Sequence, residues 1–337
     1  ADVSIDDETI SRRHAKLYAT EQGLAVEDLK SAYGTQVNGH KLEAFQAVEI
    51  KAGDKTNERL RTLFPAIGYR LFRQLGGAPI LVPDFPQQQL DGYELNLFAA
   101  KPDRAQLLSD QGFLVDTFPK WTPSPEDCDY GDSFWGDQIF APHIDVSCKT
   151  GALADVGYRY ALAGYATWRA VDKPTPVRCA ALALALRGLR SACRRTPTPG
   201  RLSTLARVAW ESGARGESVA VLKRAIQTVQ TGEVLLDEPF WPAAARFDHI
   251  VPDRQASNWF AGALAEQYEK TASFSSAFSG ASPILPWLCN QTFASAEMLR
   301  RRVLASARAG LTQTVSRRLC EAASDHLNAA IWQAGQI

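Results

Sequence analysis

The spacing of apolar residues changes near residue 151, and this change constrains the fold more than any other feature of the chain. From there to the C-terminus, apolar side chains recur every three or four residues, the spacing of one helix face. Proline and glycine interrupt the pattern at intervals. Helices are predicted over residues 154–171, 177–195, 201–212, 217–230, 254–271, 295–309 and 312–333.

Two of these helices form a recognisable pair. Residues 201–212 and 217–230 are separated by Gly213-Ala214-Arg215-Gly216, and each presents small and apolar residues on one face. The segment 201–231 resembles one tetratricopeptide (TPR) hairpin. The resemblance implies that neighbouring helices complete a stack and that the stack offers a groove to a partner helix or peptide.

Residues 1–54 show a different pattern, with short apolar runs separated by turns. Strands are predicted over residues 25–29 and 48–51. Asn38-Gly39 is the strongest hairpin signal in the chain, because both residues tolerate positive φ. The segment is therefore predicted to be antiparallel β structure.

Two motifs in this segment carry a family resemblance. Ser11-Arg12-Arg13-His14-Ala15 is similar to the S-R-x-H-A pattern of forkhead-associated (FHA) domains, and Gly34-Thr35-Gln36-Val37-Asn38-Gly39 to their later G-T-x-V-N-G pattern. The resemblance implies part of a β-sandwich whose loops bind phosphothreonine. It assigns phosphopeptide binding to Ser11, Arg12, Arg13, Thr35 and Asn38, and structural roles to His14, Gly34 and Gly39.

The implied chemistry follows from these residue types. The Ser11 hydroxyl would donate a hydrogen bond to the phosphate, and Arg12 or Arg13 would add charge-assisted hydrogen bonds to its oxygens. His14 would brace the loop and would not contact the ligand. The implied partner is a phosphothreonine-containing protein.

Residues 55–150 mix structural types. Helices are predicted over residues 57–63 and 101–111, strands over residues 69–73 and 79–82, and a long loop over residues 119–143. Residues 48–310, including Gly68-Tyr69-Arg70-Leu71 and residues 95–99, resemble the distal part and helical tail of FkbM-type methyltransferases. This resemblance implies a bacterial enzyme that uses S-adenosylmethionine on surface glycans, with its catalytic half upstream.

The residues themselves contain no complete catalytic site. No G-x-S-x-G elbow and no G-x-G-x-G turn occurs. The acidic residues between 126 and 145 form either a solvated loop or a calcium or magnesium site, and the solvated loop is favoured because the EF-hand spacing is not met. We therefore predict no catalytic residue, no metal ligand and no cofactor.

The charges balance overall but not locally. The net charge is zero, which argues against a nucleic-acid-binding protein. Residues 84–155 are predominantly acidic and residues 178–224 predominantly basic, so either these surfaces offset each other or the basic face binds an acidic partner. The arginines at 300–302, 308, 317 and 318 are predicted to form a solvated helix face.

Scattered cysteines and short apolar runs indicate the compartment. The six cysteines form no C-x-x-C pair, so they are expected to be reduced thiols. The longest apolar run, residues 179–186, is too short to span a bilayer, and no signal-peptide pattern is present. A cytoplasmic protein that does not enter the membrane is predicted.

Together these features predict an α+β protein. It consists of a truncated FHA-like antiparallel β segment (1–54), a mixed α/β segment with an acidic loop (55–150), and a TPR-like α-helical region (151–337). The expected function is non-catalytic binding of phosphothreonine peptides and partner proteins. The alternative is a distal fragment of an FkbM-type methyltransferase.

Overall fold

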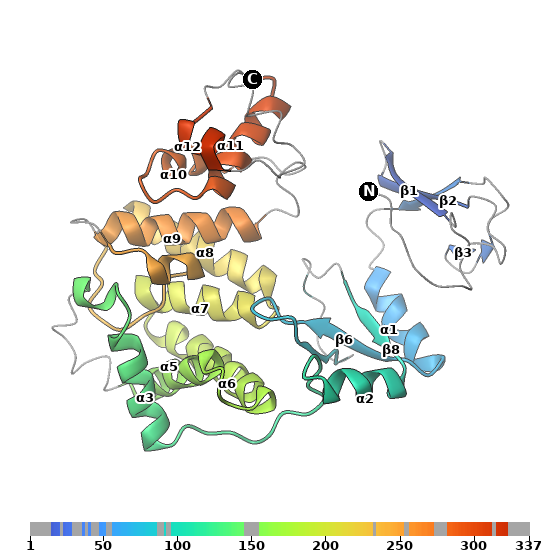
Figure 1. The fold of residues 1–337 in the computed structure, drawn as a ribbon, viewed down its shortest axis with the longest axis horizontal. Coiled ribbons are helices and arrows are strands. Elements are labelled where there is room, and N and C mark those ends of the chain that lie inside the picture. The colour runs from blue at the N-terminus through green and yellow to red at the C-terminus, as the bar shows by residue number, and fades with distance from the viewer. Residues whose placement is uncertain are drawn as a thin grey trace. The chain divides into compact units, whose positions relative to one another are not determined.

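The computed structural model divides the chain into two compact units, Ala1–Leu63 and Phe64–Ile337 (Figure 1). Each is considered separately below. In the first unit, the structure describes the backbone of the strands and the start of helix α1. From residue 56 onward it describes residues 56–85, 91, 96–144, 155–231, 234–252, 256–272, 282–311 and 315–322.

The first unit contains antiparallel β structure, as predicted. One sheet has the strand order β1-β2-β5, and a separate pair joins β3 and β4. Val37 pairs with His40, so β3 and β4 flank the expected Asn38-Gly39 turn. The strands are β1 (Ala15–Thr20), β2 (Gly23–Asp28), β3 (Gln36–Val37), β4 (His40–Lys41) and β5 (Ala47–Lys51).

A small antiparallel sheet follows helix α1 (Thr56–Ala66). Its strands are β6 (Arg70–Gln74), β7 (Leu81–Pro83) and β8 (Phe98–Ala100), in the order β7-β6-β8. Helix α2 (Pro102–Asp110) covers it, and Phe72, Ala105 and Leu114 form a local core. Gly112, at φ 77°, follows the end of α2. The predicted helices and strands of this region are confirmed, with boundaries shifted by one to three residues.

The predicted loop at residues 119–143 was wrong, because it contains helix α3 (Pro125–Gly136) and a short 3-10 turn, η1 (Ala141–His143). The Ser124 hydroxyl accepts a hydrogen bond from the Asp127 N–H, and the Asp127 carboxylate accepts one from the Ser124 N–H. This reciprocal capping box, followed by proline in the first turn, starts the helix.

The buried face of α3 carries little of the apolar periodicity that predicts a helix. Cys128, Gly131 and Trp135 are buried and recur at helical spacing, but only one of them is a large apolar residue. Gly131 lies against α5, where a Cβ atom would come within 2.9 Å of the Ala163 Cα. Absence of a side chain therefore allows the two helices to approach closely.

Helices α5 to α9 pack consecutively, each against the next (Figure 1). The α5–α6 contact is close, since a Cβ atom on Gly164 would lie 2.9 Å from the Ala181 carbonyl oxygen, and one on Gly188 would lie 2.9 Å from the Ala161 Cβ. The helices are α5 (Val156–Arg169), α6 (Thr175–Arg195), α7 (Pro199–Glu211), α8 (Arg215–Thr231) and α9 (Ala256–Thr271).

These helices confirm the five predicted between residues 154 and 271. Gly213 takes φ 83° between α7 and α8, a conformation that glycine adopts without strain. Farther on are α10 (Leu285–Cys289), α11 (Ala296–Arg308) and α12 (Arg317–Ala322). Helix α10 was not predicted. The helix predicted over 312–333 is confirmed at α12, and residues 312–314 and 323–337 lie outside the described residues.

Residues 234–250 lie between α8 and α9 and are called the connector here. The connector contains no α-helix and ends near the 3-10 turn η2 (Ala245–His249). Its aromatic residues Phe240 and Trp241 are buried, with Phe140 6.2 Å from Trp241 between ring centroids. The Thr204 hydroxyl accepts a hydrogen bond from the Trp241 N–H, while the Ser203 hydroxyl donates one to the Trp241 carbonyl. Side chains of α7 thus satisfy backbone groups that no ladder pairs.

Candidate functional site

The pairing in the β1-β2-β5 sheet places the start of β1, the end of β2 and the start of β5 at one end of the sheet. Ala15, the first residue of β1, pairs with Asp28, the last residue of β2. Glu27 of β2 pairs with Ala47, the first residue of β5. The chain therefore enters β1, leaves β2 and enters β5 at the same end of this sheet.

The sequence motifs adjoin these points. The Ser11–His14 motif leads directly into β1, and the Gly34-Thr35 motif follows β2 and leads into β3. The residues predicted to bind the phosphopeptide (Ser11, Arg12, Arg13, Thr35 and Asn38) and the predicted structural residues (His14, Gly34 and Gly39) lie outside the described residues. Their roles remain predictions.

The second unit contains a pocket of about 710 Å³ between the small sheet, helix α6 and the α7–α8 turn. Arg73 of β6 lines it on one side, Leu186 and Arg187 of α6 on another, and Ser212 at the end of α7 on a third. A shallower depression of about 600 Å³ lies between α6 and α8. Arg190 and Glu217 line both and form an ion pair with a 2.5 Å N–O contact. Sequence reasoning did not find this pocket, because its walls come from segments far apart in the chain.

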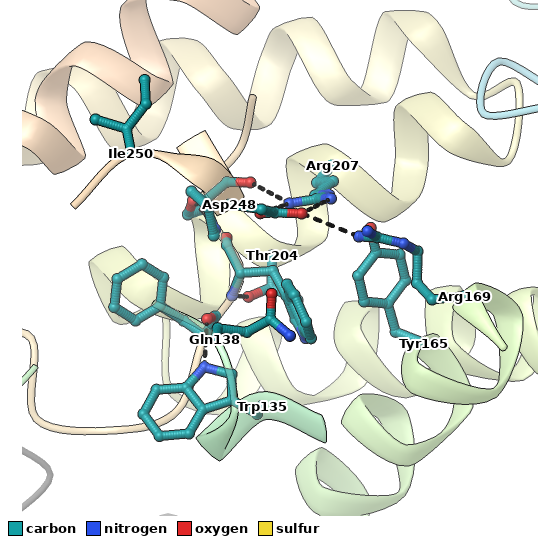
Figure 2. A network of polar contacts seen from close by, with 12 residues as sticks. Trp135, Gln138, Tyr165, Arg169, Thr204, Arg207, Asp248 and Ile250 are labelled. Atoms are coloured by element: carbon teal, nitrogen blue, oxygen red, sulfur yellow. Dashed lines mark hydrogen bonds and ion pairs between the residues drawn. The ribbon is translucent and has the colours of Figure 1, made fainter. Parts of the chain in front are cut away.

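A buried polar network lies elsewhere, where α5 and α7 meet the connector (Figure 2). Arg207 of α7 donates two hydrogen bonds to Asp248, at 2.6 and 2.7 Å, and Arg169 of α5 donates a third at 3.1 Å. Arg207 also contacts Glu211 at 3.2 Å. The Arg207 and Asp248 side chains are only 2% and 1% exposed.

Glu211 extends the network towards the core of the helices. Its carboxylate accepts hydrogen bonds from the Tyr165 hydroxyl at 2.8 Å and the Trp168 indole N–H at 2.7 Å. Burial raises the pKa of Tyr165 far above its usual value. Burial alone would lower the pKa of Arg207, but its contacts with Tyr165 and Asp248 outweigh this and raise it. Tyr165 thus stays neutral and Arg207 stays charged at neutral pH, and the buried contacts that they make indicate a structural network.

Ion pairs compensate part of the acidic segment, and those from Asp155 to Arg195 and Arg201 reach the basic segment. Arg159 of α5 pairs with Asp129 and Asp132 of α3, at 2.8 and 2.7 Å. Arg201 of α7 pairs with Asp155 and Glu238, both at 2.9 Å. Asp129 and Asp132 of α3 therefore help to bind a neighbouring helix. The loop predicted there was wrong, but Glu126, Asp129 and Asp137 are exposed, as the solvated alternative predicted.

The predicted solvated arginine face near the C-terminus was also partly wrong. Arg301 is 4% exposed and donates a hydrogen bond of 2.5 Å to Glu269 of α9, which is 2% exposed. Arg318 donates to the carbonyls of Gln291 and Ala294. Arg317 agrees with the prediction, since it is exposed and pairs with Glu321 one turn later. These arginines mainly attach α11 and α12 to their neighbours.

Three buried thiols and the arrangement of possible metal ligands bear on thiol and metal chemistry. Burial raises the pKa of Cys179 and Cys289 to about 11 and that of Cys193 to about 12, so these thiols stay protonated at neutral pH. No three His, Cys, Asp or Glu side chains of the described part cluster as metal ligands would. Likewise, none of the helices described is both long and apolar enough to cross a bilayer.

Comparison with known families bears on the N-terminal sheet. Residues 1–56 match the family model of the FHA domain. The match covers the three segments that meet at one end of the β1-β2-β5 sheet. Searches of curated proteins and of solved structures found no match. The TPR and FkbM-type resemblances gain nothing from these comparisons and remain predictions.

Proposed function

We propose that the N-terminal residues 1–56 bind phosphothreonine peptides and that the chain is a non-catalytic interaction protein. The match of this segment to the FHA domain family carries the proposal. Two features support it: the antiparallel strands, and the register that places the start of β1, the end of β2 and the start of β5 at one end of the sheet. FHA domains bind phosphothreonine through loops at one end of their sheets.

In this proposal Ser11, Arg12 and Arg13 bind the phosphate. A serine hydroxyl donates one hydrogen bond, and each guanidinium offers several charge-assisted ones, which together favour a dianionic phosphate over an unmodified hydroxyl. Thr35 and Asn38, on either side of β3, would contact the peptide. The consecutive helices of the second unit, with the α7–α8 hairpin as a TPR-like element, would bind a separate partner.

The direct test is fluorescence anisotropy with the full chain and labelled phosphothreonine peptides of varied flanking sequence. We expect saturable binding that requires the phosphate and falls at least about tenfold in Ser11→Ala. Thr20→Ala is the matched control, because Thr20 pairs with Gly23 at the opposite end of the same sheet. Binding should survive in this control.

Two patterns of binding would reject the proposal. One is equal affinity for phosphorylated and unphosphorylated peptides. The other is phosphate-dependent binding that Ser11→Ala and Thr20→Ala reduce to the same extent. Circular dichroism of each variant establishes that the chain is folded before titration, so absence of binding by the folded native chain would also reject it.

A further inference from the structure

The pocket between the small sheet and α6 has an unusual balance of donors and acceptors. Its three carboxylates are already engaged. Asp91 accepts a hydrogen bond of 2.6 Å from the Gly216 N–H at the start of α8, and Glu217 is paired with Arg190. Asp84 also has an interaction within the protein. Each of them therefore already has an interaction within the protein.

Donors on the pocket walls are in surplus. Arg187 of α6 is exposed and has no hydrogen-bond or ion-pair partner among the described residues. Arg73 of β6 donates through one terminal nitrogen to the Ser212 carbonyl at 3.0 Å, but its Nε atom is buried without a partner in the part of the chain described. The Ser212 hydroxyl is likewise buried and unpartnered there, in a residue 7% exposed.

The remaining walls are apolar. Leu182 and Leu186 of α6, Val82 of β7 and Phe118 provide hydrocarbon and ring surface beside these donors. Volumes of 300 to 1,000 Å³ suit small organic ligands, and such sites combine apolar walls with a few polar groups that orient the ligand. At about 710 Å³, this pocket falls within that range.

We infer that this pocket binds a small organic anion with an apolar body. The anionic group would lie beside Arg187 and the Arg73–Ser212 wall, and the apolar body against the leucines of α6. A cationic ligand is disfavoured because the carboxylates are already paired and a guanidinium would be left facing it. This site is separate from the proposed phosphopeptide site and goes beyond that function.

The test uses two probes that differ in one group. 8-Anilinonaphthalene-1-sulfonate is an aromatic anion, and N-phenyl-1-naphthylamine has the same rings without the sulfonate. With the full chain, we expect the sulfonate to bind at one site, at least about tenfold more tightly than the neutral amine. Fluorescence titration gives the affinities, and isothermal calorimetry gives the stoichiometry of the sulfonate.

Three variants assign the site. Arg187→Gln should weaken binding of the sulfonate by about tenfold and leave the amine unchanged, since it removes one charge-assisted contact. Arg194→Gln is the matched control: it is also an exposed arginine of α6 without a partner among the described residues, but it does not line this pocket. Ala183→Phe adds a ring to a residue that lines the pocket and should abolish binding of both probes.

Several outcomes would overturn the inference. These are equal affinity for the two probes, equal effects of Arg187→Gln and Arg194→Gln, or many weak sites without a saturable one. Retained binding in Ala183→Phe would place the probe elsewhere and would overturn it too. Phosphopeptide titration of the same variants should be unaffected, so failure here leaves the phosphopeptide proposal standing.

Discussion

Asp248→Asn is expected to be one of the most destabilising isosteric changes in the second unit. The substitution removes the charge that binds Arg207 through two hydrogen bonds and Arg169 through a third, without creating a cavity. Removing one partner of a buried ion pair typically costs about 3–5 kcal/mol. The lower end of this range applies, because Arg207 keeps a second carboxylate partner, Glu211, at 3.2 Å. The expected cost is therefore about 3 kcal/mol.

Urea unfolding followed by tryptophan fluorescence measures this cost. All eight tryptophans lie after residue 63, so the signal reports on the second unit alone. With an m-value of about 3 kcal/mol/M, the midpoint should fall by about 1 M. Asp129→Asn is the matched control, because Asp129 pairs with Arg159 but is 76% exposed, and it should cost less than about 1 kcal/mol.

A double-mutant cycle with Arg207→Gln tests the physical reason. If the cost comes from an unpaired buried charge, the double variant should be less destabilised than the sum of the single variants, by about 1–3 kcal/mol. Additive costs, or a cost for Asp248→Asn no larger than for Asp129→Asn, would refute the reasoning.

Three further predictions concern packing, thiols and acid. Gly164→Ala should cost about 1–3 kcal/mol in thermal unfolding, since its Cβ atom would lie 2.9 Å from a backbone oxygen of α6; Gly136→Ala, with no atom within 4 Å of its Cβ, should not destabilise. At pH 8 a thiol reagent should modify exposed Cys320 well before Cys193, whose pKa burial raises to about 12, and mass spectrometry of timed samples would contradict this if both reacted together. Burial alone would raise the pKa of Asp155, but the Tyr158 N–H and two arginines lower it, so Asp155 stabilises the fold above its unfolded pKa and ceases to do so as pH falls through its folded pKa. Asp155→Asn should therefore lower Tm at pH 7 by more than at pH 2.5, and an equal difference at both would contradict the assignment.

Helices with large apolar stripes were predictable from the sequence, and those with small buried residues were not. In α9, Trp259, Phe260 and Leu264 recur at helical spacing, and the helix lies where it was expected. In α3, Cys128 and Gly131 occupy the buried face, so the period was hidden. The signal that would have found α3 is its start, Ser124-Pro125 with Asp127, which specifies a capping box.

The buried charges were unpredictable for a different reason. Arg201 and Arg207 lie in the most buried helix, α7, and each has a partner thirty-seven or more positions away in the connector. A charged residue at a core position indicates that a partner exists but not where it lies. The pocket was unpredictable for a similar reason. Its donors Arg73 and Arg187 come from a strand and a helix far apart in the chain, and no periodic pattern in the sequence links them.

The connector between α8 and α9 also limits how the second unit can be divided. In an array built from identical repeats, each pair of helices contacts only its neighbours and can be removed or duplicated. Here α7 offers hydroxyls and a guanidinium to residues 239–248, while α3 and α5 offer Trp135 and Tyr158 to the same stretch. A fragment ending at Thr231 would retain all of these side chains and lose the backbone groups that they bind. The helices therefore form one indivisible unit, and shuffling or excising the α7–α8 hairpin would not transfer a stable module to another protein.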